Sequence, residues 1–517
     1  MKHLNIAVLA ALLGACSTGP SVTPASPYDQ AFDAVMTRYD LPGLALGVIE
    51  NGRVVYTRAA GELALGSGEE ITTDTLFKIA SNSKAMTASV LARLVDAGKL
   101  DWNDPVVEHL PQFRMYDPWV TDNITVGDLL VHNSGLPEGA GDLMLWPEPN
   151  GFTRADIVAG LAHLKPEYGF RSGYAYDNLL YVVAGEVAAA AGGASYEELV
   201  RREVFEPLGL DCRVGEWQSA DAENAAQPHM RVDDRNVAVR VDEAVVPAIT
   251  SAAAGGIRCS LDDMMAWALN WLAPTAEQFA WLSEEQRRAM WTPRTLMPIS
   301  ERRREWNNTH YYAYAYGVRL ADADGAFTVS HTGTLMGMYS VMTLLPDTAS
   351  GFVMLTNGEG GDARTVMNEV LLSHFTAPEQ ERTANWYAAE LEREAESQGG
   401  SEAPDTSARR PASPGGAELR TGVWRDPWFG EIAICARGDE VRFVAAKSPR
   451  LEGTVMQVGE RHLVDWDDDT VDVEAWLDFP GQDEGTASAL RMAKVDPEAD
   501  FSFDYEDLAF TRIRDCE

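Results

Sequence analysis

The period of the hydrophobic and polar positions changes several times within residues 28–376, and the order of these changes predicts the fold class. A helical pattern at 28–39 is followed by two strand patterns at 44–50 and 53–60, which are joined by the turn-forming pair Asn51-Gly52. Helical patterns fill about 100–270, and strand patterns return at 313–357. We therefore expect an α+β domain in which one antiparallel sheet is completed by both ends of the segment, flanked by helices and joined to an all-helical region.

The pattern changes again after this domain. Residues 377–417 contain a charged, helix-compatible piece followed by a stretch rich in Gly, Ser, Pro and Ala, and we interpret them as a linker. Residues 418–517 consist of short alternating runs separated by turns, which predicts a small all-β barrel or sandwich. The expected strands of the barrel are 431–436, 440–445, 454–458, 462–466, 471–479, 487–493 and 508–513.

The first residues predict export. A basic start is followed by an apolar run that ends at Ala15 and is too short to span a membrane as a mature helix. The small residues before Cys16 resemble a bacterial lipoprotein processing signal. We therefore expect a signal peptide at 1–15, a tether at 16–27 and a periplasmic or cell-envelope protein held to the membrane by lipid on Cys16. The alternative is an ordinary cleaved signal with an incidental cysteine.

Composition narrows the class of function. The chain has 517 residues, 45% of them hydrophobic, which is enough for a sizeable core. Its formal net charge of −37 would repel nucleic acid, so we exclude a nucleic-acid partner. The nine histidines form neither His-x-His nor HExxH, and we expect no metal and no other cofactor.

Export would place the cysteines after Cys16 in an oxidising compartment. Four remain, and they allow three pairings. Proximity in sequence and expected domain membership favour Cys435–Cys516, and secondly Cys212–Cys259.

Candidate chemistry begins at Ser81-Asn82-Ser83-Lys84. A serine three residues before a lysine, at the start of a predicted helix, places a hydroxyl and an amine on one helix face. Lys84 is the only one of the seven lysines with a serine three residues before it. An adjacent amine can activate a serine hydroxyl, so we expect Ser81 to be a nucleophile.

Tyr176-Asp177-Asn178 is a second candidate. A phenol near a lysine ammonium can have a lowered pKa and act as a general base, which is the role expected for Tyr176. Asn178 could hydrogen-bond both the lysine and an incoming amide. The alternative is a packed aromatic loop.

His331-Thr332-Gly333-Thr334, at the end of a strand pattern, is the third candidate. Gly333 would let a substrate lie against the strand edge without a clashing Cβ atom. The backbone N–H of Thr334, together with that of Ser81, could face a developing oxyanion. His331 could instead be an ordinary hydrogen-bonded residue.

In this order, the three motifs resemble the serine β-lactamase and penicillin-binding hydrolase superfamily, in the branch of class C β-lactamases, D-aminopeptidases and esterases. The resemblance implies an acyl-enzyme on Ser81, with Lys84 moving the serine proton. Tyr176 would be the base of acylation or the activator of the deacylating water, and which of the two takes the first proton stays open. Asn178 would orient Lys84 and the substrate.

The resemblance also bears on the substrate. His331 stands where the β-lactamases carry lysine, and a mostly neutral histidine holds a carboxylate less firmly. We therefore expect a hydrolase of small esters or D-amino-acid peptides. The alternatives are a weakly hydrolytic penicillin-binding sensor and a true β-lactamase.

The C-terminal segment contains Gly422-Val423-Trp424, Trp428-Phe429-Gly430 and Phe501-Ser502-Phe503-Asp504-Tyr505, and with them it resembles a lipocalin-like β-barrel module. Such a module could bind a ligand, cover the mouth of the active site or mediate oligomerisation, and the oligomeric state stays open.

Overall fold

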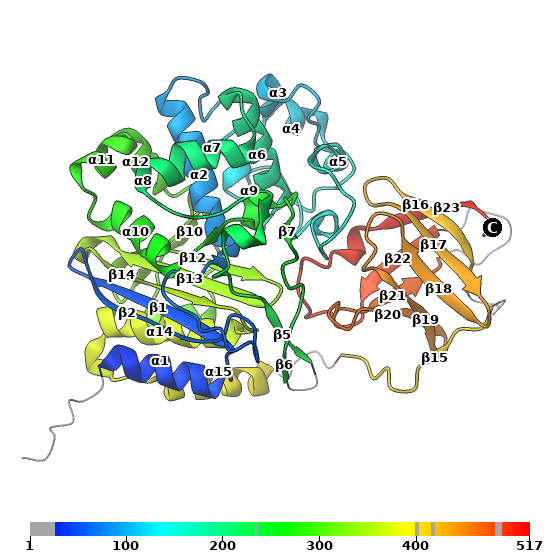
Figure 1. Cartoon of the computed structure of the whole chain (residues 1–517). Coiled ribbons are helices and arrows are strands. Elements are labelled where there is room, and N and C mark those ends of the chain that lie inside the picture. The colour runs from blue at the N-terminus through cyan, green and yellow to red at the C-terminus, as the bar shows by residue number, and fades with distance from the viewer. Residues whose placement is uncertain (1–25, 233–234, 399–402, 415–418, 481–488, 517) are drawn as a thin grey trace, which may run out of the picture.

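The computed structural model describes residues 26–232, 235–398, 403–414, 419–480 and 489–516. The predicted signal peptide, Cys16 and most of the tether lie outside these residues. Figure 1 shows two parts side by side: a larger part of helices around a sheet, and a β-barrel formed by the C-terminal segment. The α+β class and the C-terminal barrel that the sequence predicted are both confirmed.

The larger part is built on an eight-stranded antiparallel sheet with the order β2-β1-β14-β13-β12-β11-β10-β9. The strands are β1 (Gly43–Glu50), β2 (Arg53–Gly61), β9 (Thr295–Leu296), β10 (Tyr312–Tyr314), β11 (Arg319–Ala323), β12 (Ala326–Leu335), β13 (Met338–Leu345) and β14 (Ser350–Thr356). The first strand pairs with the last, with Leu46 opposite Met354. The two ends of the segment therefore complete one sheet, as their strand patterns predicted.

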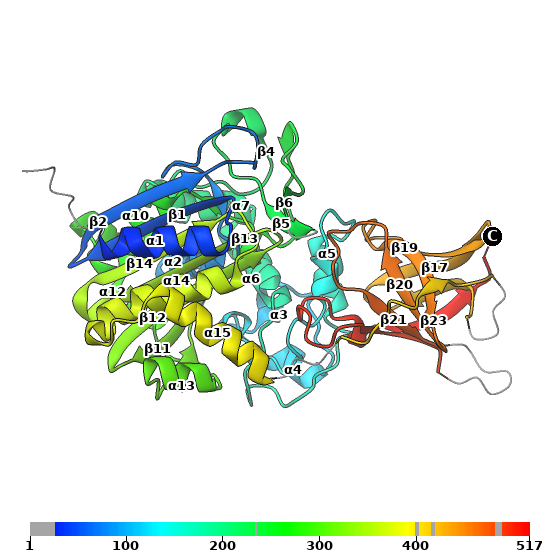
Figure 2. The same ribbon diagram turned by 90° about the horizontal axis from the view of Figure 1, so that it is seen from below.

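Helices cover both faces of this sheet. The helices α1 (Pro27–Arg38), α14 (Gly361–Thr376) and α15 (Ala384–Gln398) lie together on one face, as the view from below shows (Figure 2). On the other face, α10 (Leu261–Leu272) packs against β1 and β14, and the helical region lies above it. That region contains α2 (Ser83–Asp96), α3 (Val106–His109), α4 (Pro118–Asn123), α5 (Arg154–Gly160), α6 (Leu179–Gly192), α7 (Tyr196–Val200), α8 (Glu206–Leu208), α9 (Ala252–Gly255), α11 (Ala276–Trp281) and α12 (Glu284–Met290).

The remaining elements of the larger part are short. They are the helix α13 (Glu301–Asn307) and the strands β3 (Phe77–Lys78), β4 (Trp217–Gln218), β5 (His229–Val232), β6 (Arg235–Ala238), β7 (Val245–Val246) and β8 (Arg258–Cys259).

Helix α15 occupies residues that composition placed in a linker. Tyr387, Ala388 and Leu391 are buried in the same cluster as Val366 and Met367 of α14. Their helical spacing gives α15 an apolar face, so this part of the segment belongs to the packed domain.

The C-terminal part is a closed antiparallel barrel in which β16 to β23 follow one another around the ring, and the short strand β15 pairs with β19. The strands are β15 (Arg410–Pro411), β16 (Gly422–Asp426), β17 (Gly430–Arg437), β18 (Glu440–Ala445), β19 (Glu452–Val458), β20 (Arg461–Trp466), β21 (Ala475–Asp478), β22 (Ala489–Lys494) and β23 (Ala509–Arg514). Pairing of β16 with β23 and of β19 with β20 leaves the ring without an open edge. The sequence predicted seven of these strands and missed β15 and β16.

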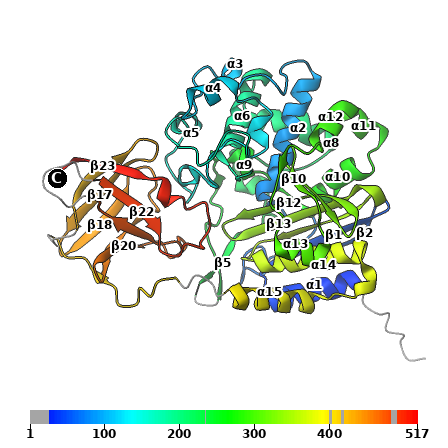
Figure 3. The ribbon, with the colours of Figure 1, turned by 180° about the vertical axis from the view of Figure 1, so that it is seen from behind.

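The barrel contacts the helical region near α5, as the view from behind also shows (Figure 3). Lys447 Nζ pairs with Asp156 Oδ1 of α5 at 2.8 Å, and Lys447 O accepts a hydrogen bond from Gly151 N at 2.6 Å. The rings of Phe152 and Phe429 pack with their centroids 5.7 Å apart. The interface thus combines backbone, charged and aromatic contacts.

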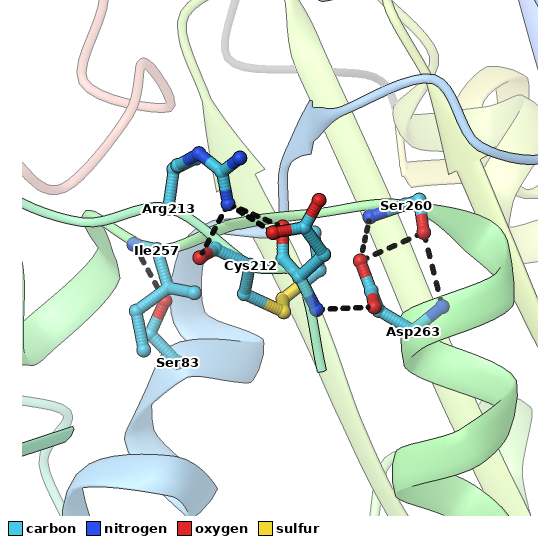
Figure 4. Close-up of a disulfide and its surroundings, with 8 residues drawn as sticks. Ser83, Cys212, Arg213, Ile257, Ser260 and Asp263 are labelled. Carbon is cyan, nitrogen blue, oxygen red and sulfur yellow. Dashed lines mark hydrogen bonds and ion pairs between the residues drawn. A yellow bond between two sulfur atoms is a disulfide. The ribbon is translucent and has the colours of Figure 1, made fainter. Parts of the chain in front are cut away.

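The described part of the chain contains two disulfides, Cys212–Cys259 and Cys435–Cys516, which are the two pairings that the sequence favoured. Figure 4 shows the first of them near the start of α2, where Ser83 Oγ accepts a hydrogen bond from Ile257 N at 3.2 Å. Because β8 contains Cys259, this contact ties the first turn of α2 to the disulfide-linked segment.

Within the described residues, no single helix is both long and apolar enough to cross a membrane. Leu179–Gly192 and Tyr196–Leu208 reach that length only as a pair bent by 76°.

Candidate active site

Ser81 lies in the short 3₁₀ helix η1 (Ala80–Asn82), directly before α2. Ala80 has φ = 48°, a left-handed conformation that is costly for a residue with a Cβ atom. Two hydrogen bonds hold this turn: Asn82 Nδ2 donates to Ser340 Oγ (2.7 Å), and Ser340 Oγ donates to Ile79 O (2.8 Å). The neighbouring strand β13 thus fixes the backbone of the candidate nucleophile.

Lys84, one turn further along, is fully buried and directed at Ser81. Its Nζ atom donates to Ser81 Oγ (3.0 Å), to Asn178 Oδ1 (2.8 Å) and to Ala254 O (2.8 Å). Burial lowers the pKa of the Lys84 ammonium to about 7. A large fraction of Lys84 is therefore neutral near pH 7 and able to accept a proton.

Tyr176 reaches Ser81 from the other side. Its hydroxyl donates to Ser81 Oγ at 2.9 Å, and its ring packs against His132 with centroids 4.2 Å apart. Burial raises the pKa of the Tyr176 phenol to about 12, so the lowered pKa expected from the nearby lysine is wrong. Desolvation of the phenolate outweighs the cations around it. Near neutral pH, Tyr176 is a hydrogen-bond donor to Ser81.

Asn178 holds Lys84 from the start of α6. Its Oδ1 atom accepts from Lys84 Nζ, and its Nδ2 atom donates to Asp142 Oδ2 at 2.8 Å. Both contacts are buried, and together they define which way the amide faces. The structure thus brings Ser81, Lys84, Tyr176 and Asn178 into one hydrogen-bonded group.

His331 lies apart from that group. Its side chain is fully buried; Nδ1 donates to Thr332 O (2.6 Å), and Nε2 accepts from the hydroxyl of Tyr314 (2.8 Å). Burial lowers its pKa well below the usual range for histidine, so the ring is neutral. His331 therefore supports Tyr314 from inside the domain and does not line the pocket at Ser81.

Gly333 is required by packing within the protein. A Cβ atom on Gly333 would lie 2.3 Å from Ile79 O and 2.3 Å from Ser340 Oγ. The strand β12 can therefore approach the turn before Ser81 only with glycine here. The sequence predicted a close approach of a substrate at Gly333. The group that approaches it is the backbone of Ile79, in the turn before Ser81. Thr334, one residue on, lines the pocket.

The pocket at Ser81 has a volume of about 380 Å³ and is lined by residues from both parts of the chain. The sequence predicted four of its residues: Ser81, Tyr176, Asn178 and Thr334. The barrel contributes Thr470, Asp472, Asp500, Phe501, Ser502 and Phe503. The barrel therefore forms one wall of this pocket, a role that the sequence did not predict.

Two arginines that sequence reasoning missed also line this pocket. Arg319 Nη1 donates to Thr332 Oγ1 (2.9 Å), and Arg364 Nη1 donates to Gly333 O and Thr334 Oγ1 (2.7 Å each). Neither guanidinium forms an ion pair with a carboxylate of the described residues. Two cations beside β12 therefore line the pocket without a carboxylate partner among the described residues.

Acidic side chains lie elsewhere around the pocket. They are Glu138, Glu359, Asp472 and Asp500. Burial raises the pKa of the Glu138 and Asp472 carboxyl groups, with a further contribution from the neighbouring Asp500. A cation bound here would stabilise their charged forms. No three His, Cys, Asp or Glu side chains of the described ranges are grouped as a metal site.

The sequence is similar to two protein-family models and to individual known proteins. The Beta-lactamase family model matches residues 28–374, and the model described as Domain of unknown function (DUF3471) matches residues 416–512. The chain is 27% identical over 389 residues to Unguisins hydrolase ungD' of Aspergillus campestris, covering 71% of this chain and 70% of the relative. It is 31% identical over 220 residues to Esterase EstB of Burkholderia gladioli, covering 40% of this chain and 54% of the relative.

The fold has a solved counterpart that covers both parts of the chain. The octameric penicillin-binding protein homologue from Pyrococcus abyssi superposes with a TM-score of 0.57 at 18% identity, over 94% of this chain and 99% of the other. Fold and site define a serine hydrolase. The chain belongs to the Beta-lactamase family.

Proposed function

We propose that this protein cleaves ester or amide bonds through an acyl-enzyme on Ser81. The observation that carries the proposal is the position of Ser81 Oγ between Lys84 Nζ (3.0 Å) and Tyr176 Oη (2.9 Å) in a pocket. A hydroxyl flanked by a partly neutral amine and a phenolic donor can lose its proton and attack a carbonyl carbon. The hydrolase and esterase names of the two relatives support the same reaction class.

Neutral Lys84 is the proposed base of acylation. It takes the Ser81 proton as Oγ attacks the carbonyl carbon, and then supplies this proton to the leaving oxygen or nitrogen as that bond breaks. Lys84 is then neutral again and can take a proton from the water that attacks the acyl group, and return it to Ser81 Oγ. Tyr176, with its pKa near 12, stays protonated and stabilises Ser81 Oγ by hydrogen bonding.

The charges of the pocket point to a short peptide-like substrate. Arg319 and Arg364 supply the carboxylate-binding cations that a neutral His331 does not, whereas the acidic side chains suit an ammonium group. We therefore propose that the substrates are small amides or esters that carry a carboxylate, an ammonium group or both, including D-amino-acid peptides. A carboxylate-bearing β-lactam fits the same two arginines, so β-lactam binding is the second candidate.

A substrate panel tests the reaction and separates the candidates. It contains a p-nitrophenyl ester, a D-alanyl p-nitroanilide and a chromogenic cephalosporin, each followed to steady state. Sustained turnover of the ester or the anilide supports the proposed hydrolase. A burst of product followed by silence with all three contradicts it and favours a penicillin-binding sensor, whereas fast turnover of the cephalosporin alone identifies a β-lactamase.

Removing the guanidinium group of Arg364 should separate substrates by charge. We expect Arg364→Met to lower kcat/KM for a carboxylate-bearing peptide by roughly 10- to 100-fold, since hydrogen bonds between charged groups contribute about 1.5–3 kcal/mol. For the same peptide with a C-terminal amide in place of the carboxylate, kcat/KM should fall by less than about threefold, the effect expected for loss of one weak contact. An equal loss for both peptides would argue against a carboxylate subsite.

Export and lipidation at Cys16 stay part of the proposal. We expect the full-length protein to sediment with bacterial membranes and Cys16→Ser to appear in the soluble fraction. A soluble wild-type protein would contradict the anchor.

A further inference from the structure

A loop of the barrel enters the hydrolase domain beside its catalytic group. Asp504, at the end of this loop, is buried, and its carboxylate accepts hydrogen bonds from Gly141 N (2.6 Å) and Leu143 N (2.9 Å). These two N–H groups flank the start of the short helix η3 (Asp142–Met144). The barrel thus fixes the backbone on both sides of Asp142.

Asp142 itself connects the two parts of the chain. The side chain is fully buried, and its Oδ2 atom accepts hydrogen bonds from Ser502 Oγ and from Asn178 Nδ2, each at 2.8 Å. A continuous series of hydrogen bonds therefore runs from Ser502 of the barrel through Asp142 and Asn178 to Lys84 and Ser81. Every distance in this series lies between 2.8 and 3.0 Å.

The donor and the acceptor at each hydrogen bond of this series decide which atom of Asn178 faces Lys84. Burial raises the pKa of the Asp142 carboxyl well above its usual range, but its Oδ2 atom accepts from both Ser502 and Asn178, so in either protonation state Asn178 presents its Nδ2 atom to it. The Oδ1 atom of Asn178 must then face Lys84, as observed. Without Asp142 in place the amide could turn over, and its N–H groups would face the Lys84 amine, which is itself a donor. The position of Lys84 Nζ beside Ser81 therefore depends on how firmly Asp142 is held.

We propose that the barrel is a positioning element of the active site, in which Ser502 and Asp504 hold Asp142 so that Asn178 keeps Lys84 directed at Ser81. This role goes beyond forming a wall of the pocket, and it rests on the proposed function of Ser81 and Lys84. Ser502 and Asp504 are positioning residues, since they act through Asp142 and Asn178.

The test uses the full chain and the rate of Ser81 acylation by a fluorophosphonate probe that carries no charged group. Ser502→Ala removes the donor to Asp142, and we expect acylation to slow by roughly 5- to 20-fold, as for loss of one buried hydrogen bond to a carboxylate. Ser502→Thr keeps the hydroxyl and should stay within about twofold of wild type on that scale. Lys447→Met, which removes a contact at another part of the interface, is the matched control and should leave the rate unchanged.

A pH profile distinguishes positioning from general loosening of the site. The titratable groups that face Lys84 are Asp142 and Asp177, whose ionised forms raise its pKa and whose own pKa values are raised by burial, and Arg319, which lowers the pKa of Lys84. Asp142→Asn keeps an oxygen acceptor but removes the ionisable carboxyl group, and because the ionised fraction of Asp142 raises the pKa of Lys84, the pH at which acylation reaches half its maximum should move to lower values. A purely structural defect would lower the rate at every pH without moving this midpoint.

Two outcomes would overturn the proposal. Acylation of Ser502→Ala at the wild-type rate would leave the barrel as a pocket wall only. An equal loss in Ser502→Ala and Lys447→Met would mean that docking as a whole, and not the contact to Asp142, supports catalysis. Failure of the proposed function itself gives a different result, because wild-type Ser81 would then not be labelled at all.

Discussion

Ser81→Ala is expected to abolish covalent labelling by a fluorophosphonate and to lower kcat/KM for any hydrolysed ester by at least about 10⁴-fold. Loss of a catalytic serine typically removes most of the rate enhancement of a serine hydrolase. The structure gives a specific reason here: Ser81 Oγ accepts hydrogen bonds from both Lys84 and Tyr176 inside the pocket. The measurements are gel-based labelling of the intact protein and steady-state turnover.

Ser83→Ala is the matched control for this result, because Ser83 lies two residues away on the same turn. Its hydroxyl is buried and accepts from Ile257 N, away from the pocket (Figure 4). We expect Ser83→Ala to lower the free energy of unfolding by about 1 kcal/mol, the usual contribution of one hydrogen bond, and to keep its labelling. Labelling that survives in Ser81→Ala but disappears in Ser83→Ala would reverse the assignment.

The fold was largely predictable because its signals are local. Strand patterns at both ends of the first segment and helical patterns between them gave the α+β class, and the alternating runs after residue 418 gave the barrel. Helix α15 was missed as part of the domain because its apolar face is short and its composition is strongly charged. Only the packing of Tyr387 and Leu391 against α14 shows where it belongs.

Some residues of the site could likewise be predicted from local sequence patterns, and others could not. The spacing of Ser81 and Lys84 is a property of one helix, and it was visible in the sequence. Strand alternation could also have separated His331 from Thr334, since neighbouring residues of a strand face opposite sides. In β12, His331 and Gly333 are buried, while Thr332 and Thr334 lie toward the pocket.

Other parts of the site depend on contacts that no local pattern contains. Arg319 reaches the pocket because β11 pairs with β12 in the register that puts Arg319 opposite Ser330. Ser502 reaches Asp142 because a separate domain docks on the first, 360 residues later in the sequence. Neither the register nor the docking could be derived from the residues around these positions.

The last prediction is that the rate of Ser81 acylation follows the titration of Lys84 as the pH changes. Only the neutral amine can take the Ser81 proton, and burial lowers the pKa of Lys84 to about 7. Acylation should therefore fall about tenfold per pH unit below this pKa and reach a plateau above it, since a protonated amine has no lone pair. Tyr176, with a pKa near 12, cannot produce a transition near pH 7.

Substitution of Lys84 tests the assignment directly. Lys84→Met should slow acylation by about 10³-fold, within the range for loss of a general base, and should abolish the transition near pH 7. Lys78→Met is the matched control: Lys78 is partly buried, with a pKa lowered to about 8 by desolvation, but it does not line the pocket. A transition that persists in Lys84→Met would mean that another group is the base. A transition that disappears only in Lys84→Met would assign the first proton transfer to Lys84 and leave Tyr176 as a hydrogen-bond donor to Ser81.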